Sequence, residues 1–181
     1  MSELNSISLF DTILYKTYLP EYLDNKDFMS VCDEYTDKAI SNAKNLIDER
    51  NKKFKTDVKD HGMSYHSGAE MYKDKRFDNF QLLIKNTARN ILENQGFDLS
   101  NYSIDYTEMW IQKFAYEGGG HQDTHVHSKL CAAMERQIVS VKPGSLLLFN
   151  SWLPHQFSVD NGIDPFRFIH FNLQAKMNGK K

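Results

Sequence analysis

Residues 118–127 read Gly-Gly-Gly-His-Gln-Asp-Thr-His-Val-His and follow a strand-like run that begins at Ser103. In an extended chain, alternate side chains project from the same face. The residues of this stretch that are predicted to share one face are His121, Asp123, His125 and His127. The three glycines allow a tight turn and leave space beside that face. Imidazole and carboxylate together suit a divalent metal such as iron, manganese or zinc, so the stretch predicts a metal site beside a strand.

A first-row metal needs a further ligand from elsewhere in the chain. His155, in Ser-Trp-Leu-Pro-His-Gln-Phe, is the candidate. Arg167 follows twelve residues later, in a run that is predicted to form the next strand. A guanidinium group can hold a carboxylate through two parallel hydrogen bonds. The chain therefore has a His/Asp-rich pair, a distal His and then an Arg, in that order.

This order resembles the iron(II)- and 2-oxoglutarate-dependent oxygenases, in particular the oxygenase-like proteins of marine phages and bacteria. The likeness covers residues 100–175, and a weaker one, Leu9-Phe10-Asp11-Thr12, extends toward the N-terminus. The motifs that carry it are Trp110-Ile111-Gln112, Gly118-Gly119-Gly120, His125-Val126-His127, Pro143-Gly144, Phe149-Asn150-Ser151-Trp152-Leu153-Pro154-His155, Arg167 and Phe171-Asn172.

The resemblance implies a double-stranded β-helix (a jelly roll, cupin-like) that binds iron(II) and takes 2-oxoglutarate as co-substrate. Register with the family favours His125, His127 and His155 as the metal ligands. The general His-x-Asp pattern of the superfamily favours His121 and Asp123 as the first pair instead. Arg167 would anchor 2-oxoglutarate, and no catalytic residue is expected beyond the metal ligands. The implied reaction is hydroxylation of an unidentified substrate, with release of succinate and CO2.

Two departures from the family pattern keep other functions open. Ile169 stands where relatives often carry a hydroxyl residue that also contacts the co-substrate. The interval between His127 and His155 is short, as after an internal deletion, whereas relatives place several strands there. A jelly roll that lacks a hairpin exposes sheet edges. The alternative function is therefore a catalytically degenerate jelly-roll binding or virion-associated module. A three-His metal enzyme that uses no 2-oxoglutarate is a third reading.

The rest of the chain predicts one α+β domain over residues 1–181, with two helices that buttress the strands. The helical support is expected over residues 20–100, and the strand core over 1–18 and 101–175. Apolar residues spaced by three and four predict helices, and alternation predicts strands. The expected elements are helices over 27–53 and 76–94, strands over 7–18, 103–111, 146–149 and 166–173, a loop over 61–68, a turn over 142–145, and a segment 130–139 that fits either helix or strand.

Composition and charge limit the kinds of partner that the chain is expected to bind. The formal charge of −2 on 181 residues gives no basic footprint for nucleic acid. No apolar run approaches the ~20 residues of a membrane span, and the N-terminal residues do not resemble a secretory signal. Cys32 and Cys131 are too few for a disulfide framework, which favours the reducing cytoplasm, of the host if the chain is phage-encoded. The expected partners are a small-molecule co-substrate and an unidentified substrate, and an unpaired edge strand would favour a homodimer.

Overall fold

The structure is a computed structural model that describes residues 5–9, 12–57, 64–114, 121–125, 139–151, 153, 155–158 and 167–179. It confirms a mixed α+β arrangement with antiparallel sheets. The elements in chain order are β1 (Asn5–Leu9), β2 (Thr12–Tyr18), α1 (Pro20–Asp24), α2 (Lys26–Phe54), β3 (Ser64–His66), the 3-10 turns η1 (Met71–Lys73) and η2 (Lys75–Phe77), α3 (Asp78–Asn94), β4 (Tyr102–Phe114), β5 (His121–His125), β6 (Ser145–Leu148), β7 (His155–Ser158) and β8 (Arg167–Met177).

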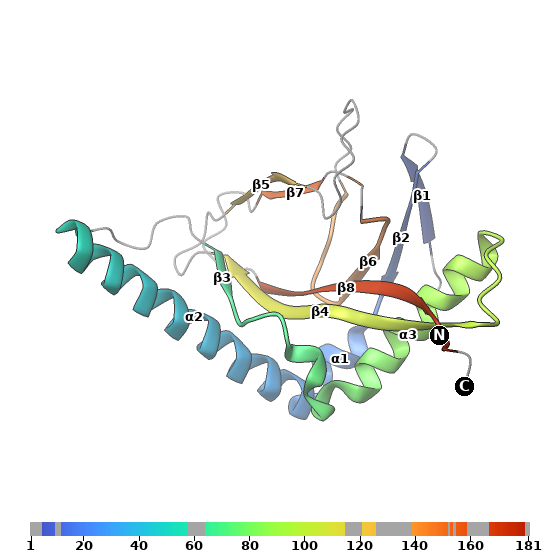
Figure 1. Ribbon diagram of the computed structural model, residues 1–181, viewed down its shortest axis with the longest axis horizontal. Coiled ribbons are helices and arrows are strands. Elements are labelled where there is room, and N and C mark those ends of the chain that lie inside the picture. Colours follow the sequence, from blue (N-terminus) through green and yellow to red (C-terminus); the bar gives the residue numbers. More distant parts are fainter. Residues whose placement is uncertain are drawn as a thin grey trace.

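Helix α2 begins and ends with recognisable capping. The side-chain oxygen of Asn25 accepts a hydrogen bond from the Phe28 backbone N–H at 3.0 Å, which satisfies one of the N–H groups left without a partner in the first turn. Lys55 adopts a left-handed conformation after the last turn. The buried residues of α2 are Val31, Cys32, Thr36 and Ala39, and none after Ala39 is buried. Figure 1 shows the later turns of α2 projecting beyond the sheet.

Helix α3 packs with α2 on one side of a three-stranded sheet of order β3-β4-β8 (Figure 1). Its apolar stripe buries Phe80, Ile84 and Ile91, the face that the spacing of three and four predicts. The helix ends before Gly96, which has a φ of +90°, a conformation that glycine adopts without steric cost. The sequence therefore places both the buried face of α3 and its end.

Strand β4 is the centre of this sheet and pairs antiparallel with β8 from Tyr102↔Met177 to Lys113↔Arg167. The register shifts between Tyr106 and Glu108, which marks a β-bulge. The other edge of β4 pairs with β3. That edge continues beyond β3, where the Met109 N–H donates to the Ala69 carbonyl at 2.8 Å. β4 is thus paired along its β8 edge from Tyr102 to Lys113 and along its other edge from Met109 to Phe114.

Two further sheets lie on the side of β4 and β8 that faces away from α2 (Figure 1). One has the order β1-β2-β6 and the other contains β5 and β7, all paired antiparallel. The turn before β6 forms as predicted, with the Ser145 N–H donating to the Lys142 carbonyl at 3.0 Å. In the described residues, the three sheets do not close on one another.

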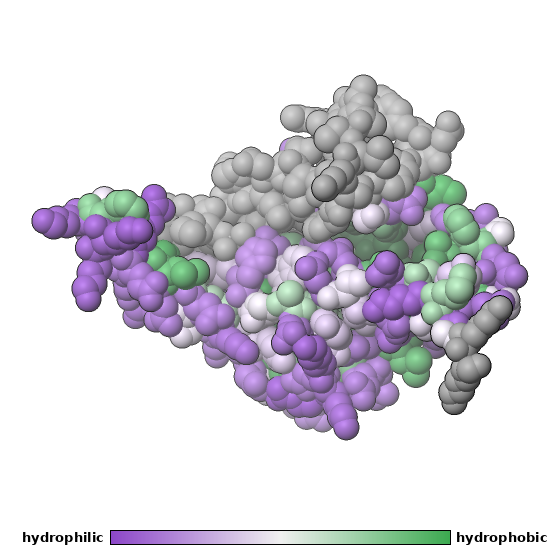
Figure 2. All heavy atoms as spheres, in the orientation of Figure 1, coloured by the Kyte–Doolittle hydropathy of each residue, from purple (hydrophilic) through white to green (hydrophobic). Residues whose placement is uncertain are grey.

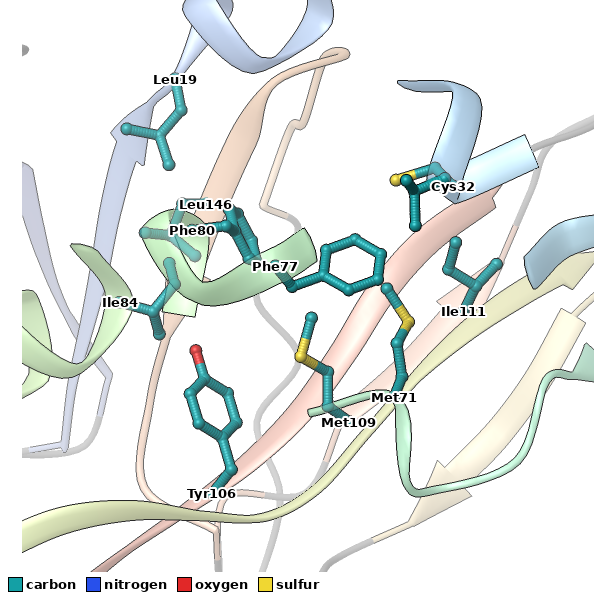
Figure 3. Close-up of a cluster of buried hydrophobic side chains, with 11 residues drawn as sticks. Leu19, Cys32, Met71, Phe77, Phe80, Ile84, Tyr106, Met109, Ile111 and Leu146 are labelled. Atoms are coloured by element: carbon teal, nitrogen blue, oxygen red, sulfur yellow. The ribbon is translucent and has the colours of Figure 1, made fainter. Parts of the chain in front are cut away.

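The hydrophobic core lies between the helices and the inner face of the β4–β8 pair. Figure 3 shows Phe77 in the middle of the buried side chains, which come from α2, η1, η2, α3, β4 and β6 and from Leu19, between β2 and α1. The labelled residues are Leu19, Cys32, Met71, Phe77, Phe80, Ile84, Tyr106, Met109, Ile111 and Leu146. Ile169 and Phe171 of β8 pack against this cluster. Among the described helices, none is both long and apolar enough to cross a membrane.

Two local predictions differ from the structure. Residues 61–68 were expected to form a loop, but residues 64–66 form β3 against the end of β4. β7 was not predicted, since His155–Ser158 is too short to show an alternating pattern. The ambiguous segment 130–139 lies outside the described residues except for Val139.

Candidate functional site

Strands β5 and β7 carry the candidate metal ligands, and their register brings two of them together. His125 is the cross-strand partner of His155. Directly opposed residues of an antiparallel pair lie on the same face, with their Cβ atoms ~4.5–5.5 Å apart. This pairing joins the two halves of the predicted site across thirty positions of sequence. His127 lies outside the described residues, as do the side chains of β5.

The register of β5 against β7 is irregular. His121 is paired with Ser158 and His125 with His155, and the register shifts between Gln122 and His125. Four positions of β5 therefore span three positions of β7, which marks a β-bulge. The side chains of His121, Asp123 and His125 lie outside the description, as does His127, so the common face expected for these four residues stays a prediction.

One ring nitrogen of His155 contacts a backbone carbonyl. Its Nδ1 lies 2.9 Å from the backbone carbonyl oxygen of Leu153. A carbonyl oxygen can only accept, so Nδ1 carries a proton, and in the neutral imidazole the lone pair is then on Nε2. The Nε2 atom is buried. Histidines that bind metals generally donate their second ring N–H to a carbonyl or carboxylate in this way.

Aromatic side chains surround His155. The Phe149 ring meets the His155 ring edge to face at 4.9 Å between centroids. His170 lies 6.5 Å away and stacks on Trp110, its cross-strand partner in β4, at 4.2 Å and an interplanar angle of 8°. His66 stacks on Trp110 at 5.9 Å. Burial lowers the pKa of His66 below its usual value.

Residues that face this site on β4 and β8 were interpreted from the sequence as core or structural. The Trp110–His170 pair and the contact with His66 depend on strand register across sixty positions. No local pattern encodes that register. Gln112, which is fully buried beside Trp110, accepts a hydrogen bond from the indole N–H at 3.4 Å. The only sequence feature that pointed to these residues was the Trp-x-Gln motif, Trp110-Ile111-Gln112.

Arg167 points to the helical side of β8. Its guanidinium donates to the Asp33 carboxylate of α2 and, at 3.1 Å, to the Thr36 hydroxyl. Ile169 and Phe171, which share its face by alternation, pack on the core. Asp160 and Asp164, the acidic residues that precede Arg167 in the sequence, lie outside the described residues. In the structure the carboxylate partner comes from α2 instead.

A cleft of about 1020 Å³ lies next to these groups. Its lining includes Arg167, His170 and Phe149, the residue that contacts His155. Figure 2 shows hydrophobic atoms in a recess above the side chains that cover β4 and β8. The cleft can therefore hold a molecule that touches both the surroundings of His155 and Arg167.

Within the described residues, no three His, Cys, Asp or Glu side chains form a group that could hold a metal ion. Three of the candidate ligands fall in β5, whose side chains are not described, and His127 lies outside the description altogether. Comparison with protein-family models and with curated proteins gives no significant match for this chain. The resemblance to a family therefore rests on the sequence motifs alone.

Proposed function

We propose that this chain is an iron(II)- and 2-oxoglutarate-dependent dioxygenase with a jelly-roll-related strand core. The observation that carries the proposal is the environment of His155. Its Nδ1–H is directed at the Leu153 carbonyl, its Nε2 is buried, and its backbone is paired with that of His125. A half-buried imidazole whose Nδ1–H is held by a carbonyl, opposite a second histidine, suits a borderline divalent metal.

In this proposal His125, His127 and His155 hold the iron. Iron with 2-oxoglutarate and dioxygen, when bound, supplies the oxidation of a C–H bond and releases succinate and CO2. The Leu153 carbonyl keeps the His155 proton on Nδ1. Phe149 and the stacked pair of Trp110 and His170 limit water around the imidazole. The chain thus orients the ligands and shields them.

Arg167 is proposed to bind the distal carboxylate of 2-oxoglutarate. It lines the cleft, but its guanidinium bonds to Asp33, whose side chain is 63% exposed. An ion pair with so exposed a partner contributes little stability, ~0.2–1 kcal/mol. A carboxylate of the co-substrate can therefore compete with Asp33. The proposal requires that 2-oxoglutarate displace Asp33 from Arg167.

The test is an anaerobic titration with iron(II) and 2-oxoglutarate. We expect a weak visible charge-transfer band, followed by succinate when oxygen is admitted. His155→Ala should abolish both, because it removes the buried nitrogen ligand. His66→Ala is the matched control, since His66 stacks on Trp110 from β3 and is assigned no metal. The absence of both band and succinate in the unmodified chain would reject the proposal.

A second candidate is a jelly-roll binding module that has lost turnover. The engagement of Arg167 by Asp33 and Thr36 favours it, and so do sheets that do not close in the described residues. It predicts metal uptake without consumption of 2-oxoglutarate, or neither. If activity instead persists in Arg167→Ala, a metal enzyme that needs no 2-oxoglutarate is the better description.

A further inference from the structure

The sheet that carries His155 is not hydrogen-bonded to the sheet of β4 and β8. β7 pairs with β5, and β8 pairs with β4, so within the described residues the two sheets share no ladder. Figure 1 shows β5 and β7 on the side of β4 and β8 that faces away from α2. The position of the His155 ring relative to the body of the protein therefore depends on contacts between side chains.

His170 of β8 supplies such a contact. Ile169 and Phe171 pack on the core, so by alternation His170 lies on the opposite face of β8, toward β5 and β7. The centroid of its ring lies 6.5 Å from that of His155, with an angle of 35° between the two planes. Aromatic rings interact directly at centroid separations of ~4.5–7 Å. His170 thus links the β3-β4-β8 sheet to the candidate ligand.

The ring of His170 is itself held in place. It stacks on the indole of Trp110, its cross-strand partner, at 4.2 Å and an interplanar angle of 8°. The indole N–H donates at 3.4 Å to Gln112, which is fully buried. Rotation of His170 away from Trp110 would lose the contact between two nearly parallel rings. The stack therefore restricts the orientation of the imidazole that faces His155.

His66 supports the same indole from the other neighbouring strand. β3 and β8 flank β4 on opposite sides, and the ring of His66 lies 5.9 Å from that of Trp110, at an angle of 27°. Three rings from three adjacent strands thus lie side by side on one sheet. His170 is the member of this row that meets His155.

A metal-binding imidazole has to be held accurately. Ligands need to lie within ~0.5 Å and ~10–20° of the productive geometry, which surrounding groups enforce. The Leu153 carbonyl contacts Nδ1 of His155, and Phe149 meets the ring at 4.9 Å. Both residues lie between β6 and β7, so they orient the ring relative to its own strand. The contact with His170 instead relates the ring to a different sheet.

We propose that His170 is a positioning residue for the metal ligand His155, and that it acts through the packing of its ring, which Trp110 holds. The inference rests on the proposed function, because it takes His155 as a ligand of the metal. The ring of His170 limits the positions open to the imidazole and keeps Nε2 where the ion binds. A planar ring is therefore required at position 170, whereas the nitrogen atoms of histidine are not.

The test is a titration of the full chain with cobalt(II), whose visible spectrum reports the arrangement of its ligands. His170→Ala and His170→Gln remove the ring and should weaken cobalt(II) binding about 10- to 100-fold. The spectrum of the complex that remains should also change. His170→Phe keeps a ring that can stack on Trp110, so it should bind cobalt(II) as the unmodified chain does, with the same spectrum. A merely structural role would not shift the spectrum.

His66→Ala is the matched control. It removes the ring on the other flank of Trp110 and should leave cobalt(II) binding and the spectrum unchanged. Unchanged affinity in His170→Ala and His170→Gln would overturn the proposal, and so would a loss in His170→Phe as large as in His170→Gln. A loss in His66→Ala as large as in His170→Ala would also overturn it, because disturbance of the sheet would then explain both.

The same titration separates this inference from the proposed function. Absence of cobalt(II) binding by the unmodified chain would reject the metal site and, with it, the positioning role of His170. Binding that depends on His155 but not on a ring at position 170 would reject the inference alone. His170→Gln and His170→Phe keep a side chain of similar size, so their comparison decides the question if His170→Ala does not fold.

Discussion

His155 and Arg167 show how one neighbouring group determines what a side chain can do. The Leu153 carbonyl fixes the His155 proton on Nδ1, so the other nitrogen is prepared to act as a ligand. Asp33 holds the Arg167 guanidinium against α2, so an incoming carboxylate has a competitor. Under the proposed function, the first contact would favour metal binding, whereas the second would oppose binding of the co-substrate. Both contacts can be changed by single substitutions.

Asp33→Asn removes the competing carboxylate. If Arg167 binds 2-oxoglutarate, the affinity for it should rise about two- to fivefold, which corresponds to an exposed ion pair of under ~1 kcal/mol. The free energy of unfolding should change by less than about 1 kcal/mol. The visible band of the iron complex reports the titration. Asp37→Asn, at an exposed position one turn later, is the control, and weaker binding in Asp33→Asn would argue against the role of Arg167.

Cys32 should be an unreactive thiol. Burial on α2 raises the pKa of its thiol to about 11, so on the order of one molecule in a thousand carries the thiolate at pH 8. We expect alkylation by iodoacetamide to be slow in the folded Cys131→Ser variant and fast after denaturation. Mass spectrometry over time measures both rates. Equal rates in the folded and denatured chain would show that Cys32 is accessible.

At the scale of elements, α2, α3 and β4 follow from the sequence because their periodicities extend over many residues. The turn at 142–145 follows from Pro-Gly. The bulge in β5 and the pairing of His125 with His155 do not, because one extra residue reverses the faces of a strand and no local pattern marks it. The same limit applies to the Trp110–His170 stack. The candidate histidines could be named from the sequence, but the pairing of His125 with His155 could not.

Gly144 tests the turn that leads into β6. Its φ is +83°, and an added Cβ would lie 2.7 Å from Cε2 of Tyr18. Gly144→Ala should lower the free energy of unfolding by about 2–3 kcal/mol, through backbone strain and the clash together. Gly96→Ala is the matched variant, because Gly96 has a φ of +90° and open space around it. The free energy of unfolding of Gly96→Ala should fall by about 1 kcal/mol. Equal losses in urea unfolding would show that Tyr18 moves aside.

At the scale of the whole molecule, one core joins α2, α3, β4 and β6 around Phe77 of η2. Ile84 is fully buried, whereas Leu82 on the same helix is 58% exposed. Ile84→Ala should cost about 2–5 kcal/mol through lost contacts and a residual cavity. Leu82→Ala should stay within about 0.5 kcal/mol. Denaturant titrations of both variants measure the difference, and similar values would mean that α3 packs by another face.

The core reaches only the first part of α2. No residue of α2 after Ala39 is buried. The side chains of Leu46 and Phe54 are 67% and 62% exposed. Residues 40–54 extend about 22 Å at 1.5 Å per residue. A helix of this length is marginal in water without tertiary support.

Heating should therefore unwind this arm before the rest of the protein melts. Ellipticity at 222 nm would begin to fall at temperatures where the near-ultraviolet signal of the tryptophans is still constant. Limited proteolysis in that interval would cut within residues 40–54 first. Coincident loss of the two signals would mean that the arm and the body unfold as one cooperative unit.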